Sequence, residues 1–575
     1  MCDKLVFDLS QELEGSPNVF IKRDMLNILD NMNGNYSSSQ SVVDTSQLSN
    51  SNKYLSYREA YLSVPLLLTL STAATTFAPA TPATSCDYAL GLKNWFGSIV
   101  HSITCDYNGT TIIQQTPFIN MWNSFKLMTS LSWNDVITQG ASIGFYPDDP
   151  LSWSYATTAG TSGVGICNNT NYQGTGFGIT VTGAYNNYKS AQGNEGFLMR
   201  QTYINYDPDG SSGTGTYAGL LTATSASNVW KSYISQKVNS TASVPGVFQI
   251  SVRATIYLKH LHSFFQNIPL LKGVFLKLTL NLNNSSVTFS SSAAGGNLTV
   301  TESSVPSGGV QVLMVASAAA NNGGAACFVA GTYIASLSVG SICLNQTQRS
   351  LANVAGGAVG GNIFLYVPAY TFNPVFEQAY LSSPLKTIEY TDVYQYQVLN
   401  VAAGGNINSL LTNGLANLKS CLILPYFTAA VPGSATGIFG SLAPYQSPFD
   451  TAGTGPTSPL ISLTNFNIVV SGQNAIYNSQ RYIWEEWNNQ LAGANSVNSN
   501  LTDGLCSSLI SQQAFEMNYC YHYVNIGRML DVEQSVPKSV QVVGQNTSAQ
   551  PINLFCFVEY GVTFQVDILT RPCTT

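Results

Sequence analysis

Charged side chains are scarce in this chain of 575 residues. Aspartate, glutamate, lysine and arginine together make up 9% of it, against about 25% in typical soluble domains. Apolar residues still account for 45%, too many for a disordered polypeptide. The remainder is rich in Asn, Ser, Thr, Gln, Gly and Tyr, which suit strands and turns better than helix interiors. A surface poor in charge can be desolvated at a low cost in free energy, so it is readily buried against neighbouring proteins. The composition therefore favours a protein of a large assembly or a secreted β protein over a cytosolic enzyme.

Basic residues are too few for a nucleic-acid surface. The net charge is −7, and the first 60 residues hold five basic and eight acidic side chains. A nucleic-acid binder normally carries a basic stripe that neutralises phosphates. We therefore expect no direct, sequence-specific binding of nucleic acid. If the protein surrounds a genome, another protein must contact that genome.

Paired cysteines and a leader are also missing. The eleven cysteines include no C-x-x-C pair, which predicts reduced, mostly buried thiols and folding inside a cell. The start, MCDKLVFDLS, has neither a basic nor an apolar region of a signal peptide. Residues 61–83 and 325–344 are uncharged or nearly so, but prolines interrupt the first and small residues fill the second. We expect no transmembrane segment.

Catalytic motifs are few, and each fails on its surroundings. The chain has four histidines and no P-loop, H-E-x-x-H or Rossmann fingerprint. GASIG at 140–144 matches G-x-S-x-G, but a nucleophile elbow needs a strand before Ser142 and a helix after it. Two prolines follow within seven residues, so we interpret the match as chance.

Possible metal and carboxylate sites are incomplete. NYDPDG at 205–210 supplies the first half of a calcium loop, but Thr216 stands where the closing glutamate belongs. A turn is the better interpretation, with weak cation binding left open. Glu485 and Glu486 in WEEW are adjacent and point apart, so they cannot flank a glycosidic bond.

Histidine and cysteine give no ligand set either. Cys520 and His522 have no partner ligands nearby in the sequence. His260 and His262, two residues apart on a helix, diverge by about 200° and cannot share a metal. We expect no catalytic residue, no metal ligand and no cofactor.

Two kinds of regular pattern dominate the rest. Residues 274–282 and 561–569 alternate between apolar and polar side chains, which predicts half-buried strands. Apolar residues at helical spacing precede the first of these: Leu261, Phe264, Phe265 and Ile268. Pro269 and Gly273 end that helix, so this region predicts a strand, a short helix and a strand.

A similar sequence of elements occurs in both halves. In 116–132, Thr116 can cap a helix, Pro117 can begin it, and one face is apolar (Phe118, Met121, Trp122, Phe125 and Met128). In 406–420, after a strand, the pattern predicts a matching helix with Ile407, Leu410, Leu411, Leu415 and Leu418. A short amphipathic helix is also possible within 21–32, in an N-terminal arm. Two β-sandwiches in tandem fit better than one barrel, and the pattern alone leaves their topology open.

Five segments together resemble the major capsid proteins of polinton-like viruses and virophages, the lineage of adenovirus hexon and giant-virus capsid proteins. They occur in the same order as in that family, in both halves of the chain. The segments are 42–68 (VVDTSQLSNSNKYLSYREAYLSVPLLL), 107–132 (YNGTTIIQQTPFINMWNSFKLMTSLS), 254–283 (ATIYLKHLHSFFQNIPLLKGVFLKLTLNLN), 465–495 (NFNIVVSGQNAIYNSQRYIWEEWNNQLAGAN) and 527–571 (beginning GRMLDVEQ).

The resemblance implies an all-β double jelly roll, two eight-stranded antiparallel sandwiches with short loop helices. It implies an N-terminal arm at 1–57, a first jelly roll at 58–345 with long surface loops, and a second at 346–575. It also implies a structural protein of the virion, assembled inside the infected host cell. Homotrimers would form pseudo-hexagonal, hexon-like capsomers. These would tile an icosahedral capsid with neighbouring capsomers, a penton protein and minor capsid proteins.

Two other classes stay open on composition alone. A β-sandwich carbohydrate-binding or adhesin protein would share the Trp and Tyr content, but is expected to have a signal peptide, paired cysteines or a complete calcium site. A β-sandwich hydrolase would need facing carboxylates or a supported catalytic triad, and the candidates above lack that geometry.

Overall fold

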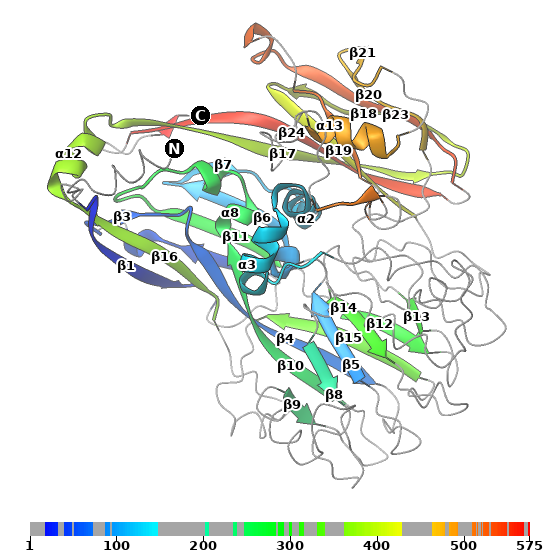
Figure 1. Ribbon diagram of the computed structural model, residues 1–575, viewed down its shortest axis with the longest axis horizontal. Helices are drawn as coiled ribbons and strands as arrows, with labels where there is room; N and C mark the ends of the chain where they lie inside the picture. The colour runs from blue at the N-terminus through cyan, green and yellow to red at the C-terminus, as the bar shows by residue number, and fades with distance from the viewer. Residues whose placement is uncertain are drawn as a thin grey trace, which may run out of the picture.

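The computed structural model describes two β-sandwiches joined in one chain (Figure 1). The described residues are 18–32, 40–48, 51–72, 87–92, 95–147, 202–205, 234–237, 247–282, 286–291, 298–301, 310–315, 331–339, 362–427, 463–477, 482–492, 509–512, 515, 519, 521–527, 531–548, 551–567 and 573–574.

The first sandwich is a jelly roll of eight principal strands. One sheet has the order β1-β16-β4-β10 and the other β2-β11-β6-β7, so that in chain order the strands run 1-8-3-6 and 2-7-4-5. This is the order of a jelly roll. The strands are β1 (Phe20–Leu29), β2 (Gln40–Asp44), β4 (Tyr61–Thr72), β6 (Val100–Tyr107), β7 (Thr110–Ile113), β10 (Val247–Tyr257), β11 (Leu276–Leu282) and β16 (Phe364–Phe372).

The second sandwich repeats this order strand for strand. Its sheets are β17-β24-β19-β22 and β18-β23-β20-β21, again 1-8-3-6 and 2-7-4-5 along the chain. The expected double jelly roll is therefore confirmed. The strands are β17 (Leu385–Val401), β18 (Asn406–Leu415), β19 (Leu418–Phe427), β20 (Leu463–Val470), β21 (Gln473–Asn474), β22 (His522–Asn525), β23 (Lys538–Asn546) and β24 (Ile552–Asp567).

Additional strands grow from the connections of the first sandwich. Some extend the sheet of β4 and β10, and three others form a separate small sheet, β14-β5-β8. They gather in Figure 1 at one end of the first sandwich, around β4 and β10 in the lower part of the picture. They are β5 (Asp87–Leu92), β8 (Thr202–Asn205), β9 (Ile234–Lys237), β12 (Ser286–Ser291), β13 (Leu298–Thr301), β14 (Val310–Val315) and β15 (Gly331–Val339); the short β3 (Tyr54–Leu55) and β25 (Cys573–Thr574) pair with β16 and β24.

Two predicted strands show the alternation that their sequences require. In β11, Leu278 and its apolar neighbours two residues away are buried, whereas Lys277 is exposed. In β24, Phe564 and Val566 are buried, whereas Thr563, which points to the opposite side of the strand, is exposed. Both predictions are confirmed, because period-two burial is what a strand covering a core produces.

The helix predicted within 116–132 is confirmed as α2 (Ile119–Ser130), although Phe118 rather than Thr116 occupies the position before its first turn. Helix α3 (Trp133–Ile143) follows it, with a capping box between Ser132 and Asp135. The predicted short helix after β10 forms as two single turns. The remaining helices are α8 (Leu258–Leu261), α9 (Phe264–Asn267), α12 (Pro374–Leu381) and α13 (Trp484–Ala492), with 3-10 turns η1 (Ser46–Leu48), η2 (Phe96–Ile99) and η5 (Asp531–Glu533).

The helix predicted at 406–420 is wrong, because this segment forms β18 and the start of β19. Ile407 and Leu411 are the buried residues of β18, four positions apart. A spacing of four places two residues on one face of a strand as well as on one face of a helix, so the spacing of Ile407 and Leu411 does not distinguish the two structures. Leu410, which the helix pattern placed on the apolar face, is 49% exposed.

The N-terminal arm and the domain boundary also differ from the prediction. Residues 20–29 form β1 rather than a helix, and β1 pairs with β16, Phe20 opposite Phe372. Of the apolar residues that suggested the helix, Ile28 enters the core while Ile21 is 67% exposed. The first sandwich therefore includes part of the predicted arm (1–57), and a boundary between residues 345 and 346 falls before its last strand.

The two uncharged stretches contain strands where the structure describes them. Residues 61–72 form β4 and residues 331–339 form β15. Across the described part of the chain, none of the helices has both the length and the apolar character to cross a membrane.

Candidate functional site

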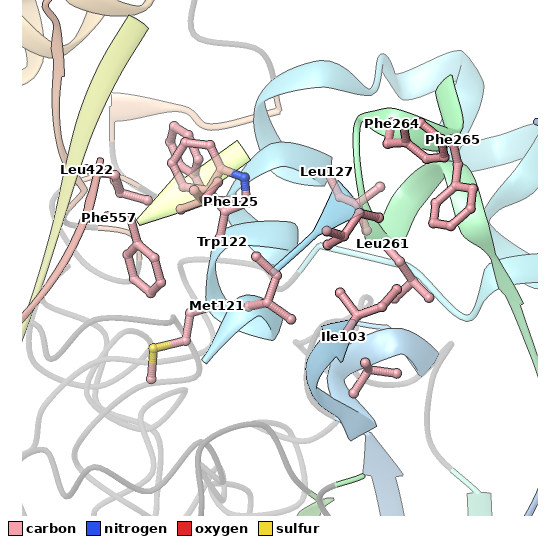
Figure 2. Packing of buried hydrophobic residues seen from close by; sticks show 14 of the residues in the cluster. Ile103, Met121, Trp122, Phe125, Leu127, Leu261, Phe264, Phe265, Leu422 and Phe557 are labelled. Atoms are coloured by element: carbon pink, nitrogen blue, oxygen red, sulfur yellow. The ribbon is translucent and has the colours of Figure 1, made fainter. Parts of the chain in front are cut away.

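The described residues form an extensive contact between the two sandwiches, and we call it the seam. It forms where α2, from the connection between β7 and β10, lies on the sheet that contains β24. Phe118 contacts Phe555 with ring centroids 5.0 Å apart, and Trp122 lies 6.2 Å from Phe557. Figure 2 shows Trp122 and Phe125 beside Phe557 and Leu422. The apolar face predicted for α2 thus covers the other sandwich.

Strand β24 shows what the seam does to the sheet. Every residue from Ile552 to Glu559 is buried, on both faces of the strand. Antiparallel sheets of a sandwich usually leave one face to water. Here the first sandwich covers that outer face, so the second sandwich buries apolar surface on both sides of β24. The two sandwiches share one continuous hydrophobic cluster.

An ion pair between an exposed lysine and a buried glutamate crosses the seam beside these rings. Lys126 Nζ on α2 lies 3.0 Å from Glu559 Oε1 on β24, and Ser420 donates a hydrogen bond of 2.6 Å to Glu559 Oε2. Burial acts to raise the pKa of Glu559, but the Lys126 ammonium and the Ser420 hydroxyl outweigh it and hold that pKa below its ordinary value. Glu559 is therefore a carboxylate held by its partner across the seam.

A second polar pair lies further along the seam. His262 Nε2 and Asp392 Oδ1 are 3.3 Å apart, and both side chains are buried. The Phe264 amide donates to His262 Nδ1 at 3.2 Å. In the neutral ring this places the proton on Nε2, which donates it to Asp392. The hydroxyl of Tyr560 donates to the other carboxylate oxygen at 3.3 Å.

Hydrogen bonds to backbone carbonyls fix the position of β17 on the first sandwich. Thr116 donates to the carbonyl of Val393 at 2.9 Å, and Tyr390 donates to the carbonyl of Ile112 at 2.7 Å. Asn267 donates to the carbonyl of Glu389 at 2.7 Å. Because such bonds require definite directions as well as distances, they fix the orientation of the second sandwich as well as its contact.

Side-chain contacts with the first sandwich hold the linker between the two sandwiches in place. Helix α12 follows β16 directly, and its Glu377 accepts a hydrogen bond of 2.9 Å from Tyr54 and an ion pair of 3.2 Å from Lys272. The Tyr54 hydroxyl, more than Lys272, lowers the pKa of Glu377. Tyr380 donates to the carbonyl of Leu270 at 2.7 Å. The connection thus adds to the rigidity that the seam provides.

The sequence motifs that suggested chemistry lie apart from one another. Ser142 is in the last turn of α3, with helix rather than strand before it, which excludes a nucleophile elbow. Glu485 and Glu486 are adjacent in the first turn of α13. Asn205 ends β8, and residues 206–210 of the calcium-like sequence lie outside the described residues.

The histidines lie in separate aromatic surroundings. His260 packs near Trp95 and Tyr257, and burial lowers its pKa to about 4. His522 in β22 packs against Phe466 and Tyr482, while Cys520 lies outside the described residues. Within the described ranges, no group of three or more His, Cys, Asp or Glu side chains could hold a metal ion.

The described cysteines agree with the thiol prediction. Cys105, Cys421 and Cys556 are free and buried. Burial raises the pKa of each thiol, which keeps it protonated and unreactive.

Sequence patterns missed the polar residues of the seam. The one signal for the ion pair was Lys126 on an otherwise apolar helix face. Asp392 stood out only as a carboxylate within the Tyr-rich segment 390–396. Neither pattern says which residue lies opposite, because the partners are far apart in the sequence. His262 and Asp392 are separated by 130 positions, and Lys126 and Glu559 by several hundred.

No protein-family model matches the chain, and no curated protein is similar to it in sequence. Among solved structures, it is similar to a chain of the Sputnik virophage determined by cryo-electron microscopy, with 11% identity, a TM-score of 0.46, and 97% of this chain and 89% of that one covered. It is similar to the mavirus major capsid protein, with 7% identity, a TM-score of 0.41, and coverage of 98% and 92%. It is also similar to the Faustovirus major capsid protein, with 9% identity, a TM-score of 0.40, and coverage of 96% and 92%.

Proposed function

We propose that this chain is the major capsid protein of an icosahedral virus and that it forms homotrimeric, pseudo-hexagonal capsomers. The observation that carries the proposal is the repeat of one jelly-roll order in two sandwiches that a buried seam holds together. Three such chains arranged around a threefold axis present six similar sandwiches. One polypeptide can then occupy a position with six neighbours.

The seam suits a structural role. A shell subunit has to keep its shape under lateral contact, and the edge-to-face ring contact, the ion pair and the hydrogen bonds to backbone carbonyls all fix one sandwich on the other. The low charge of the chain suits burial against neighbouring capsomers. The described residues that resembled enzyme motifs are separated from one another. The proposed role is structural rather than catalytic.

The further assignments follow from that role. The protein would be located in the capsid shell of the virion, after assembly inside the infected host cell. Its partners would be neighbouring capsomers, a penton protein at the fivefold positions and minor capsid proteins. The net charge of −7 argues against direct contact with the packaged nucleic acid.

The decisive experiment measures the mass and the shape of the particles that the purified chain forms. Native mass spectrometry should give a species of three times the 61.6 kDa chain. Class averages from negative-stain electron microscopy should show a hexagonal outline with threefold symmetry, or closed shells. Two-lobed monomers or dimers over a wide concentration range would contradict the proposal, and a glycan-binding screen would then test the adhesin alternative.

A further inference from the structure

Two asparagine–glycine pairs lie in the described part of the chain, and their surroundings differ. Asn108 and Gly109 connect β6 to β7, whereas Asn413 and Gly414 lie near the end of β18. An asparagine in a protein is chemically labile. A following glycine makes it more so, because its backbone nitrogen can reach the side-chain amide carbon with no Cβ in the way. The reaction therefore depends on how firmly the fold holds each pair.

The pair at Asn108 is held in a tight turn. Asn108 has a φ of 46° and Gly109 a φ of 89°, as a two-residue hairpin of type I′ requires. Asn108 Oδ1 accepts a hydrogen bond of 3.2 Å from the Phe275 amide, and the Asn108 amide donates to the Phe275 carbonyl at 3.1 Å. The side-chain amide of Asn108 is therefore held toward Phe275 and away from the nitrogen of Gly109.

The pair at Asn413 lies in an irregular part of a strand. Where β18 pairs with β23, Asn413 and Gly414 lie opposite the single residue Ser539. This is a β-bulge, which interrupts the ladder of backbone hydrogen bonds. The carbonyl of Ser539 accepts a hydrogen bond of 2.9 Å from Ser471, on the β20 side of β23. Among the described strands, β23 is the one neighbour of β18. The neighbouring strand thus leaves the backbone at Gly414 free to rotate.

Both residues of this second pair are open to water. Asn413 and Gly414 are exposed, and a Cβ added at Gly414 would meet no atom within 4 Å. The Gly414 amide donates to the Thr412 hydroxyl at 3.4 Å, which is long for a hydrogen bond of this kind. The side chain of Asn413 has no hydrogen-bond partner in the part of the chain that the structure describes. The amide carbon of Asn413 is thus free to approach the Gly414 nitrogen.

We propose that Asn413 is a site of spontaneous deamidation in the folded protein, whereas Asn108 is protected. The Gly414 nitrogen gives its proton to solvent and bonds to Asn413 Cγ. The Cγ–Nδ2 bond breaks, and ammonia leaves with a proton taken from solvent, so that a succinimide ring remains. Water then opens the ring in one of two ways. Cleavage of the bond between the nitrogen and Cγ gives aspartate, and cleavage at the backbone carbonyl gives isoaspartate, whose main chain runs through Cγ.

The reaction changes the charge of the second sandwich without requiring it to unfold. Either product adds one negative charge to a chain in which charged residues are only 9% of the total. Leu415, two positions further on, pairs with Lys538, whose ammonium lies 3.5 Å from Glu533. The new carboxylate therefore arises close to an existing ion pair. Isoaspartate also adds a methylene group to the main chain, in a bulge that already accommodates an extra residue. Molecules of different age should thus differ in surface charge.

Peptide mapping by mass spectrometry tests the proposal on the purified full-length protein, incubated at mildly alkaline pH and sampled over several weeks. Fragment ions should localise the replacement of NH2 by OH to Asn413, in two products that elute separately, while Asn108 stays intact. In urea the two pairs should deamidate at similar rates, because the protection of Asn108 requires the fold. An Asn413 that stays intact in the folded protein, or reacts no faster than Asn108, would overturn the proposal.

Gly414→Ala tests the route of the reaction. The added methyl group meets no atom within 4 Å, so near-ultraviolet circular dichroism should match that of the wild-type chain. Deamidation at Asn413 should slow several-fold, because a Cβ restricts the backbone rotation that brings the two atoms together. An unchanged rate in this folded variant would show that the nitrogen of residue 414 is not the attacking group.

Discussion

Lys126 and Glu559 lie 433 positions apart in the sequence, yet their charged atoms meet at 3.0 Å between the two sandwiches. The lysine side chain is 41% exposed, whereas the glutamate is 8% exposed. Water therefore reaches one partner and hardly reaches the other. Removing the lysine leaves the glutamate buried without its counter-ion, which costs more than the pair itself contributes.

We expect Lys126→Met to lower the free energy of unfolding by about 2 kcal/mol, a value reduced from that of a fully buried pair because the lysine is partly solvated. The double variant Lys126→Met with Glu559→Leu should recover most of this loss, since it removes the buried charge as well. Urea titration followed by tryptophan fluorescence measures both. Equal losses in the single and the double variant would show that the ion pair is not the cause.

Trp122 should be the most costly single truncation on α2. It is 5% exposed and packs against Phe557 and Phe125. Trp122→Ala should lower stability by about 3–5 kcal/mol, because the cavity opens at the centre of the seam. The matched control is Trp133→Ala on α3, where the ring is 59% exposed and the loss should stay below about 0.5 kcal/mol. Thermal unfolding of the two variants side by side gives the comparison.

Acid should weaken the fold partly through His260. Burial lowers its pKa to about 4 in the folded chain, whereas the value in an unfolded chain is about 6.5. Between these values the unfolded chain binds a proton that the folded chain does not. Stability therefore falls as the pH drops from about 6.5 to 4, by up to about 3 kcal/mol from this group. Glu559, whose pKa is lowered, adds to the loss in the same direction as the pH falls through its folded-state pKa.

His260→Gln isolates the histidine contribution. The difference between the urea midpoints at pH 7 and pH 5 should be smaller in this variant than in the wild-type chain. At pH 8 the two chains should differ only by the change in packing. An unchanged difference between pH 7 and pH 5 would show that other groups account for the acid sensitivity.

Leu278→Asp tests the core of the first sandwich. Leu278 is 2% exposed in the middle of β11, so the substitution buries a carboxylate without a partner, and no soluble capsomer should form. Lys277→Asp, one position away on the exposed side of the strand, should remain soluble. Gel filtration of the two variants after identical expression distinguishes them, and normal assembly of Leu278→Asp would contradict the face assigned to β11.

The features that sequence patterns predicted correctly were local. The alternation around Leu278 and the apolar face of α2 each depend on residues a few positions apart, so both could be recognised without knowledge of the fold. The helix expected at 406–420 failed for a local reason too, since the four-residue spacing of Ile407 and Leu411 fits one face of a strand as well as one face of a helix.

The seam could not be predicted in this way. His262 and Asp392 are 130 positions apart, and nothing in either neighbourhood specifies the other. The apolar residues of β1 misled because Ile21 and Met25 are exposed at an outer face instead of being buried on one side of a helix. A pattern reports that an apolar side chain needs cover, but not whether the cover comes from the same helix, another sandwich or another chain.

The pairing of β1 with β16 has a consequence for synthesis on the ribosome. Leu29 pairs with Phe364, and Phe20 with Phe372. The strand that pairs with β1 is therefore synthesised only after more than 300 further residues. At about 5–20 residues per second, the wait is roughly 20 to 70 s. During that time β1 has no partner strand, and an unpaired apolar strand readily joins a foreign edge. The nascent chain should therefore depend on chaperone protection until residue 372 has left the exit tunnel.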